Sequence, residues 1–296
     1  MALDSGTWTS STTGSGTWEI SDSGVLTVSG TGEVAFSSAS SVPWYVSSSC
    51  SSITSLVVNS GITALGRNAF FSISNMTSAS IPNTVTTIGY QSFTNCRSLT
   101  SINIPNSVTS IGQNAFNGCK GLPSITLPDS VTSIGNSAFY NCTSLASIDI
   151  GEGLTTIEGS AFASCEALTS IILPASLTSI GTYVFNACEK LTSITFKGKT
   201  APSIGDYAFK LSPSSWTNVT ATVYTNGGWG SDDVFTETIR GGSYVTFTYE
   251  KLVTANVHIN VSGTWKESTP YVNVNGTWKE VTGVYVNVDG NWKEVQ

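Results

Sequence analysis

The sequence predicts a mainly β fold: a solenoid of about seven 23-residue coils with a parallel sheet, β caps and a C-terminal tail of β-hairpin repeats. Three observations predict it. A phenylalanine recurs every 23 or 24 residues, at Phe70, Phe93, Phe116, Phe139, Phe162, Phe185 and Phe209. A short segment of alternating apolar residues recurs with the same period. All eight tryptophans lie outside the repeats, where residues that cover the open ends of a solenoid are expected.

The chain of 296 residues has a low share of charged residues, 10%, where about 25% is typical of soluble domains. Its net charge of −7 argues against nucleic acid or an anionic membrane surface as a partner, because both attract basic groups. Because no apolar run reaches about 18 residues, no membrane insertion is expected. The first residues have neither the basic nor the apolar region of a signal peptide, so none is expected there.

Each repeat begins with a short strand. Segment 101–104 alternates, so Ile102 and Ile104 are expected to share the interior face. The equivalent segments are expected to pair in one parallel sheet, one strand per coil, about 4.8 Å apart. Pro105 follows the strand, where a proline ends a ladder without removing a needed donor. A period in the twenties on this leucine and isoleucine skeleton indicates a leucine-rich-repeat solenoid.

The returning half of each repeat fills the interior from the other side. Val108 and Ile111 are expected to point inward there. Gly112 and its equivalents Gly135 and Gly181 are expected to allow the tight backbone turn that places the following Ala and Phe inside.

A cysteine stands three residues after the phenylalanine in five repeats, at Cys96, Cys119, Cys142, Cys165 and Cys188. Stacked equivalents point their Cβ atoms in parallel, whereas a disulfide needs them turned toward each other at about 3.8 Å. No His or acidic residue recurs beside them, which argues against a metal site. The pattern therefore predicts a structural ladder of buried, reduced thiols, with Cys50 interpreted as outside the register.

The segments that flank the repeats divide the chain into four predicted parts. Residues 1–51 are expected to form an N-terminal β cap, 52–211 the solenoid, 212–255 a C-terminal β cap and 256–296 three β-hairpin repeats. In the first cap, strands are expected on both sides of the Asp-Ser-Gly sequence at 22–24. Trp44 and Tyr45 are then expected to lie over the first coil.

In the C-terminal cap, strands are expected around Tyr224 and Phe247, with Trp216 and Trp229 nearby. The tail then repeats a second unit every 13 to 14 residues, as "HINVSGTWKE", "YVNVNGTWKE" and "YVNVDGNWKE". Two of these units carry Asn-Gly or Asp-Gly between alternating segments, which is a strong hairpin signal.

Each tail hairpin carries one tryptophan, and these form the candidate docking tail: Trp265, Trp278 and Trp292. With a two-residue turn, Trp278 is expected opposite Asn273, while Val272 and Val274 use the other face. Such small hairpins bury little on their own, so they are expected to dock on a partner or on a second copy of the chain, or else to fold back onto the C-terminal cap.

The unit "LTSINIPNSVTSIGQNAFNGC" resembles the BspA-like leucine-rich repeat. The opening "SGTWEISDSGVLTVSGTGEV", followed by "PWY", resembles the segment that precedes such repeats in bacterial surface proteins. This resemblance implies an adhesive solenoid without enzymatic activity that binds proteins, glycans or cell surfaces. The tail unit "YVNVNGTWKEV" resembles short repeats in tail and other structural proteins of phages that infect Gram-positive bacteria.

These resemblances imply a non-enzymatic phage structural protein, located in the virion, that contacts the bacterial host surface. The expected partners are a host cell-surface protein or glycan for the solenoid, and other virion proteins or a second copy for the tail. The alternatives are a purely structural or decorative virion protein, and a bacterial cell-surface adhesin whose signal peptide was removed.

No catalytic, cofactor-binding or metal-binding residue is predicted. His258 is the single histidine, and it occupies the position that Tyr271 and Tyr285 fill in the sister hairpins. Asp232 and Asp233 could contact calcium but lack the spaced oxygens of a dedicated loop.

The expected binding face is found by comparing the copies within the chain. One outward position of the strand is always Ser, whereas the next varies: Val57, Ser80, Asn103, Thr126, Asp149, Ile172 and Thr195. A second variable position follows the glycine: Arg67, Tyr90, Gln113, Asn136, Gly159, Thr182 and Asp206. The strand column is the candidate binding face, although unconstrained solvent-exposed positions vary in the same way.

Overall fold

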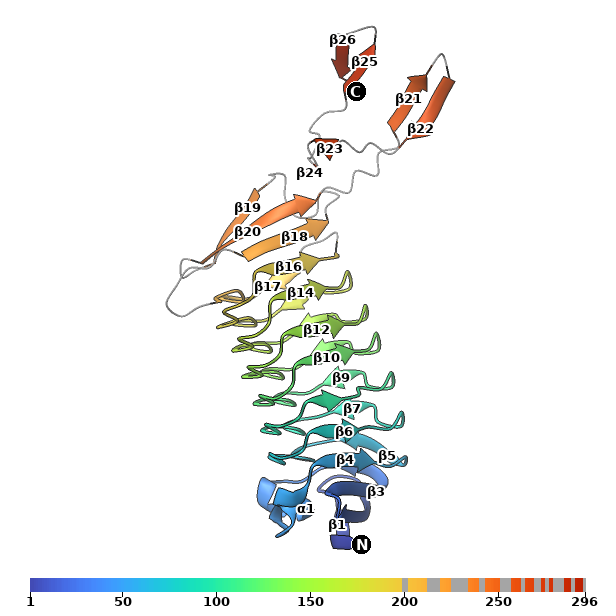
Figure 1. The fold of residues 1–296 in the computed structure, drawn as a ribbon, viewed down its shortest axis with the longest axis vertical. Coiled ribbons are helices and arrows are strands. Elements are labelled where there is room, and N and C mark those ends of the chain that lie inside the picture. Colours follow the sequence, from blue (N-terminus) through green and yellow to red (C-terminus); the bar gives the residue numbers. More distant parts are fainter. Residues whose placement is uncertain are drawn as a thin grey trace.

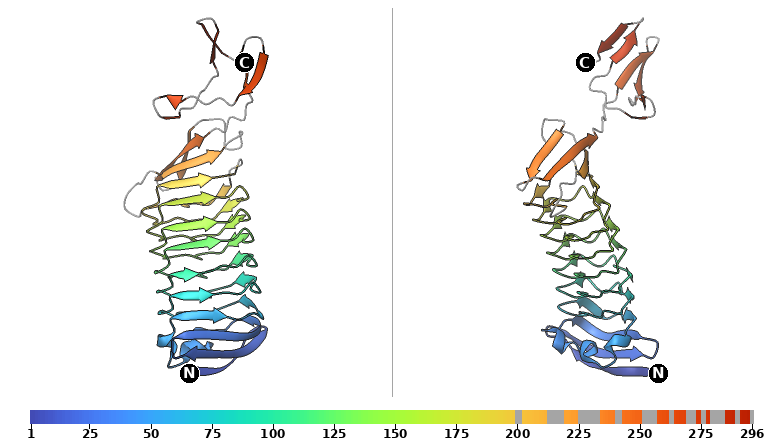
Figure 2. Two further views of the ribbon diagram at one scale, coloured as in Figure 1. Left: turned by 45° about the vertical axis from the view of Figure 1, so that its right-hand side comes forward. Right: turned by 60° about the vertical axis from the view of Figure 1, so that its left-hand side comes forward.

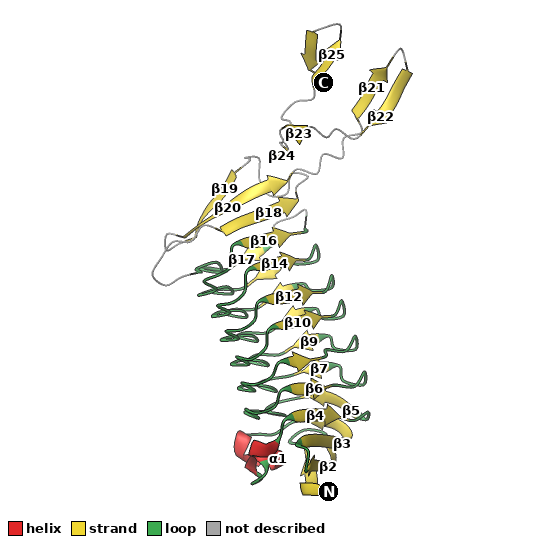
Figure 3. Cartoon of the chain, viewed as in Figure 1, coloured by secondary structure: helices red, strands yellow, loops and turns green. Residues whose placement is uncertain are grey.

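The computed structural model describes residues 1–198 and 202–211 in full, and from residue 219 onward it describes the backbone of strands β18 to β26. The coils stack in a column from the N-terminal cap upward, which confirms the predicted solenoid (Figure 1). Helix in the described chain is confined to α1 (Pro43–Val46) and the 3₁₀ turns η1 (Ala39–Ser41) and η2 (Cys50–Ser52), so the fold is mainly β (Figure 3). Within these residues no helix is long and apolar enough to cross a membrane.

Each coil contributes two parallel strands. The strands of the first half of each repeat are β4 (Ser55–Val58), β6 (Ser78–Ser80), β8 (Ser101–Ile102), β10 (Ser124–Leu127), β12 (Ser147–Ile150), β14 (Ser170–Leu173) and β16 (Ser193–Phe196). Equivalent residues pair in register, as Ser124 does with Ser147. We call their outward surface the strand face; its arrows stack along the column in Figure 2.

The returning half of each repeat forms the second column of strands, which corrects the expectation of one sheet. Its members are β5 (Ile62–Leu65), β7 (Thr87–Ile88), β9 (Ser110–Ile111), β11 (Ser133–Ile134), β13 (Thr156–Ile157), β15 (Ser179–Ile180) and β17 (Ser203–Ile204). Successive members pair in parallel, Ser110 with Ser133 and Ile111 with Ile134. The sequence signal was weak because most of these strands have only two residues.

One strand of the N-terminal cap starts both columns. The cap is an antiparallel meander of β1 (Ala2–Thr9), β2 (Gly14–Ser21) and β3 (Val25–Val34). The first half of β3 pairs with β4 and its last residues pair with β5, both in parallel. Strand β3 therefore provides the strand edge on which each of the two parallel ladders begins.

The core is a continuous stack of aromatic rings. From Phe93 to Phe209, successive phenylalanine rings lie 5.2 to 5.7 Å apart with interplanar angles of 4° to 9°. Trp44 begins the stack: it lies 5.6 Å from Phe70, and its indole N–H donates to the carbonyl of Ala69 at 3.0 Å. Tyr45 packs edge-on against Phe71, so both cap residues lie over the first coil as predicted.

The glycine column lies where adjacent coils approach closely, and its glycines are not left-handed, which corrects the expectation above. In the third coil Asn114 and Gly118 have positive φ, 56° and 73°, whereas Gly112 is not among the residues with positive φ. A Cβ on Gly112 would lie 2.7 Å from the carbonyl carbon of Gly89 in the preceding coil. The fifth coil carries Glu158 at this position, and its carboxylate accepts a hydrogen bond from the backbone N–H of Asn136 at 2.9 Å.

Hydroxyl groups bind the coils together where charged residues are scarce. A threonine in five successive coils donates its hydroxyl to the carbonyl of the equivalent threonine one coil earlier, at 2.9 to 3.3 Å: Thr86, Thr109, Thr132, Thr155 and Thr178. The Thr- and Ser-rich composition therefore satisfies backbone carbonyls along the column.

The sheet continues past the last coil. Strand β18 (Val219–Tyr224) pairs in parallel with β16, and β20 (Ser243–Glu250) pairs in parallel with β18. Strand β19 (Val234–Ile239) lies antiparallel to β20. Strands thus occur at the places predicted around Tyr224 and Phe247, whereas Trp216 and Trp229 lie outside the described residues.

Three antiparallel strand pairs follow in the tail. They are β21 (Val257–Val261) with β22 (Thr264–Ser268), β23 (Asn273–Val274) with β24 (Thr277–Trp278), and β25 (Tyr285–Val288) with β26 (Asn291–Glu294). Asn273 pairs with Trp278, the register predicted from a two-residue turn.

The glycine column yields a first prediction. Gly112→Ala should lower the free energy of unfolding by about 1–3 kcal/mol, because the added methyl group forces two backbones apart. Thermal unfolding followed by circular dichroism measures it, with Gln113→Ala, the exposed neighbouring position, as the control. Equal melting temperatures for the two variants would contradict the close-approach explanation.

A candidate binding groove on the strand face

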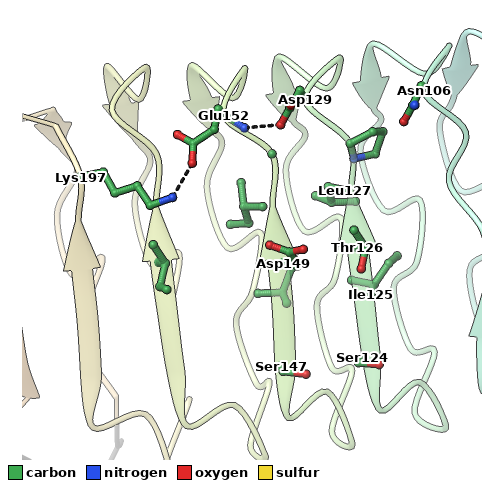
Figure 4. A pocket seen from close by; sticks show the side chains of 15 residues that line it. Asn106, Ser124, Ile125, Thr126, Leu127, Asp129, Ser147, Asp149, Glu152 and Lys197 are labelled. Atoms are coloured by element: carbon green, nitrogen blue, oxygen red, sulfur yellow. Dashed lines mark hydrogen bonds and ion pairs between the residues drawn. The ribbon is translucent and has the colours of Figure 1, made fainter.

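An open groove of about 580 Å³ lies across the strand face, over β10 and β12 (Figure 4). Both strands alternate between exposed and buried residues, so Thr126 and Asp149 point outward while Ile125 and Leu127 enter the core. Ile172 of β14 and Lys197, which directly follows β16, extend the lining toward the C-terminal coils. With Asn106, which follows β8, five successive coils contribute to one surface.

The loops that follow the strands form one rim of the groove. Asp129 Oδ1 accepts a hydrogen bond from the backbone N–H of Glu152 at 2.8 Å, and the Glu152 carboxylate forms an ion pair with Lys197 (Figure 4). The side chains of Glu152 and Lys197 are 54% and 45% exposed, so this pair contributes at most about 1 kcal/mol.

The centre of the groove combines a carboxylate with an apolar surface. Asp149 is exposed, and within the described residues its carboxylate makes no hydrogen bond or ion pair. Ile172 is 51% exposed, one of few large apolar side chains so open to solvent in this part of the chain. An available acceptor beside an exposed apolar side chain suits non-covalent binding.

The chemical groups of the groove are carboxylates, hydroxyls, one amide and one lysine, and its lining includes neither histidine nor cysteine. Over the residues that the structure describes, no three His, Cys, Asp or Glu side chains gather to hold a metal ion. His258 lies in β21, where only the backbone is described.

The seven residues of the predicted binding face follow the outer surface of the first column. Ser80, Asn103, Thr126, Asp149 and Ile172 are exposed, whereas Val57 and Thr195 are half-buried. The groove collects three of the seven: Thr126, Asp149 and Ile172.

Asn103 has a structural role. Its amide accepts a hydrogen bond from the backbone N–H of Ile81 at 3.1 Å and donates one to the carbonyl of Ile81 at 3.0 Å. The comparison between repeats within the chain missed the rim residues Asp129, Glu152 and Lys197, which lie after the strands. These residues could have been found from their charge, because charged residues are scarce in this chain.

The five ladder cysteines are free thiols with fully buried side chains. Each Sγ donates to the carbonyl of the phenylalanine 26 residues earlier, in the preceding coil, at 3.1 to 3.2 Å. Burial raises the pKa of Cys96, Cys142 and Cys188 to about 12 and raises the pKa of Cys119 and Cys165 well above the ordinary thiol value. These thiols remain protonated and poorly nucleophilic at neutral pH.

Cys50 belongs to the same register, which corrects its interpretation as an outlier. It precedes Cys96 by 46 residues, two repeats, with Ile73 at the position between them. Cys50 is half-buried and packs against the core, and burial raises its pKa as well.

The tail tryptophans have equivalent backbone registers. Trp265 pairs with Asn260, Trp278 with Asn273 and Trp292 with Asn287. Their side chains lie outside the described part of the structure.

Comparisons with known proteins agree with this architecture. The family described as "BspA type Leucine rich repeat region" matches in six copies over residues 33–123 and 115–226, which together span more than half of the chain. No curated protein sequence matches the chain.

Several solved structures are similar. A leucine-rich cell surface protein from Faecalibacterium prausnitzii A2-165 is 22% identical, with 74% of this chain and 70% of that chain covered and a TM-score of 0.49. A leucine-rich repeat protein from Eubacterium ventriosum is 24% identical, with coverages of 74% and 79% and a TM-score of 0.36. Another from Bacteroides ovatus is 27% identical, with 60% of this chain aligned to 58% of its length and a TM-score of 0.38.

The thiol ladder predicts a pH dependence of stability. The folded pKa of Cys142, about 12, lies above the unfolded value of about 8.5, so the folded state binds more protons between these values. Its stabilising effect is complete below pH 8 and falls by about 1.4 kcal/mol per pH unit as the pH rises above 9.

Urea unfolding at pH 7 to 11 of the wild type and Cys142→Ala tests this dependence. The difference in unfolding free energy between the two should be constant up to pH 8 and shrink above pH 9, because only the wild type loses the contribution of Cys142. Tyrosine ionisation affects both proteins equally and cancels in the difference. Parallel curves up to pH 11 would contradict it.

Proposed function

The chain belongs to the BspA-type leucine-rich repeat family, and from this premise we propose that it is a non-enzymatic binding protein that holds a macromolecular target on its strand face. The observation that carries the proposal is the groove around Asp149 and Ile172. It is open and is built from five successive coils, so it suits a target that lies across several coils better than a small enclosed ligand.

We place this binding function on the surface of a phage particle that contacts its bacterial host. The support is the resemblance of the tail unit "YVNVNGTWKEV" to repeats in phage structural proteins. The target would be a host cell-surface protein or glycan.

The second candidate is a bacterial cell-surface adhesin, which the family and the opening segment "SGTWEISDSGVLTVSGTGEV" favour. Both candidates use the same strand face, and they differ in what carries the protein. A purely decorative virion role would leave the groove without a target.

The tail is proposed as the attachment element. Three short strand pairs of two to five residues per strand bury little surface by themselves, so docking on a virion protein or on a second copy would stabilise them. This arrangement would leave the strand face free for the target.

The groove is tested with the double variant Asp149→Lys/Ile172→Lys. Both side chains are exposed, so the fold should persist, while attachment of the labelled chain to a panel of intact Gram-positive cells should fall at least tenfold, about 1.4 kcal/mol or more. Lys120→Glu, an exposed charge change away from the groove, is the control. Undiminished attachment would contradict the groove as the target site, and sugars released from the cells would contradict a non-enzymatic role.

The tail is tested by deleting residues 256–296. The truncated chain should keep the circular dichroism and melting temperature of the solenoid, because the core aromatic stack ends at Phe209. It should lose self-association in sedimentation or incorporation into particles. A truncated chain that assembles as the full chain does would show that the tail is not the anchor.

A further inference from the structure

Two tyrosines occupy backbone positions that favour small polar residues. In each coil the residue two before the core phenylalanine is left-handed, with φ between 54° and 59°: Asn68, Gln91, Asn114, Ser137, Ser160, Tyr183 and Tyr207. Asn and other short polar residues tolerate this conformation, whereas it is an outlier for a bulky residue. The sixth and seventh coils nevertheless use tyrosine.

The two tyrosines stack on each other, with Tyr183 exposed and Tyr207 half-buried against the core. Their ring centroids lie 5.0 Å apart with an interplanar angle of 14°, and Tyr183 is 39% exposed. The ammonium group of Lys210 lies 5.9 Å from the ring of Tyr207. One face of Tyr183 is thus covered by Tyr207, and its other face is directed along the column toward the fifth coil.

The fifth coil has no large side chain to cover that face. The position equivalent to Tyr183 is Ser160, which places only a hydroxymethyl group where a third ring would continue the stack. Its neighbour Gly159 has no side chain, and a Cβ there would lie 3.0 Å from Asn136 Nδ2 and 3.3 Å from Thr182 Oγ1, so these two side chains border the turn. The tyrosine stack therefore ends at Tyr183, with no third ring beyond it.

A further exposed tyrosine lies beyond this coil. Tyr140, in the fourth coil, is 40% exposed, and its backbone N–H donates to the carbonyl of Ser137 at 3.1 Å. This contact places the column of Tyr140 beside the column of Ser137, Ser160 and Tyr183. The turn of the fifth coil that holds Ser160 thus lies between two coils that carry exposed tyrosines, Tyr140 and Tyr183.

We propose that the open face of Tyr183, together with the turn around Ser160, is a carbohydrate-binding site in which one sugar ring takes the place of the missing aromatic ring. A pyranose presents an apolar C–H face that can stack on tyrosine, and hydroxyls around its edge. The neighbouring turns offer matching uncharged partners, with Thr182 exposed and Asn186 half-buried.

The charges of this region disfavour an anionic ligand. Glu158 and Asp206 lie in the same set of turns, and the chain carries a net charge of −7, so a nucleic acid would be repelled. The site lies on the turns and not on the strand face, so it does not rest on the groove proposed above.

Two variants test the site from opposite directions. Tyr183→Asn removes the ring and restores the residue that Asn68 and Asn114 provide in other coils. Relief of backbone strain offsets the lost stack, so the melting temperature should change by no more than about 3 °C. Ser160→Tyr keeps Tyr183 but extends the stack over its open face. Gln91→Asn, at the equivalent position three coils before Ser160, is the matched control.

The full-length chain and these variants would be titrated with cellopentaose, mannopentaose and N-acetylchitopentaose, with binding measured by saturation-transfer NMR and calorimetry. We expect at least one pentasaccharide to bind the wild type and Gln91→Asn equally, and Tyr183→Asn and Ser160→Tyr at least tenfold more weakly. Binding of none of them, equal binding by all variants, or binding of decaproline peptide in their place would overturn the proposal. Cell attachment through the groove is a separate measurement, so failure of either proposal leaves the other to be judged on its own result.

Discussion

Every coil of this protein has to lie against the preceding one at the spacing of a parallel β ladder, and the rest of the structure follows from that contact. The core rings stack at 5.2 to 5.7 Å because the two strand columns hold successive coils about 4.8 Å apart, which leaves room for one ring per coil. The same spacing leaves no room for a Cβ on Gly112. It also brings each buried thiol within reach of a carbonyl one coil earlier, as Cys119 reaches Phe93.

A structure held by contacts between neighbouring coils needs a first coil that has something to pair with. Strand β3 meets this need because it is long enough to pair with β4 at one end and β5 at the other. Trp44 provides the first ring of the aromatic stack. At the other end β18 and β20 continue the parallel pairing beyond the last coil. The column is thus started and continued by elements whose sequences do not follow the repeat.

The repeat could be predicted from the sequence because residues of the same type, such as those at Phe116 and Cys119, recur with a fixed period. What could not be predicted were features that depend on the distance between coils. The second strand column has mostly two-residue strands, and the reason for Gly112 lies in the backbone of another coil. The groove was predictable only in part: Asp149 and Ile172 stood out as variable positions, whereas Glu152 and Lys197 are 45 residues apart in sequence and meet only in the fold.

The fifth coil departs from the repeat at several positions, and both proposed surfaces use it. It carries Gly151 where four coils have proline, Glu158 in the glycine column and Gly159 in the following turn. Neighbouring coils hold it in place: Ser176 donates its hydroxyl to the carbonyls of Glu152 and Leu154 at 2.6 Å. Such support lets one coil lose repeat residues without losing its position in the stack. The interior of this fold permits little variation, so residues that depart from the repeat are tolerated where neighbouring coils support the backbone. At such places the surface can differ from the repeat and form a binding site.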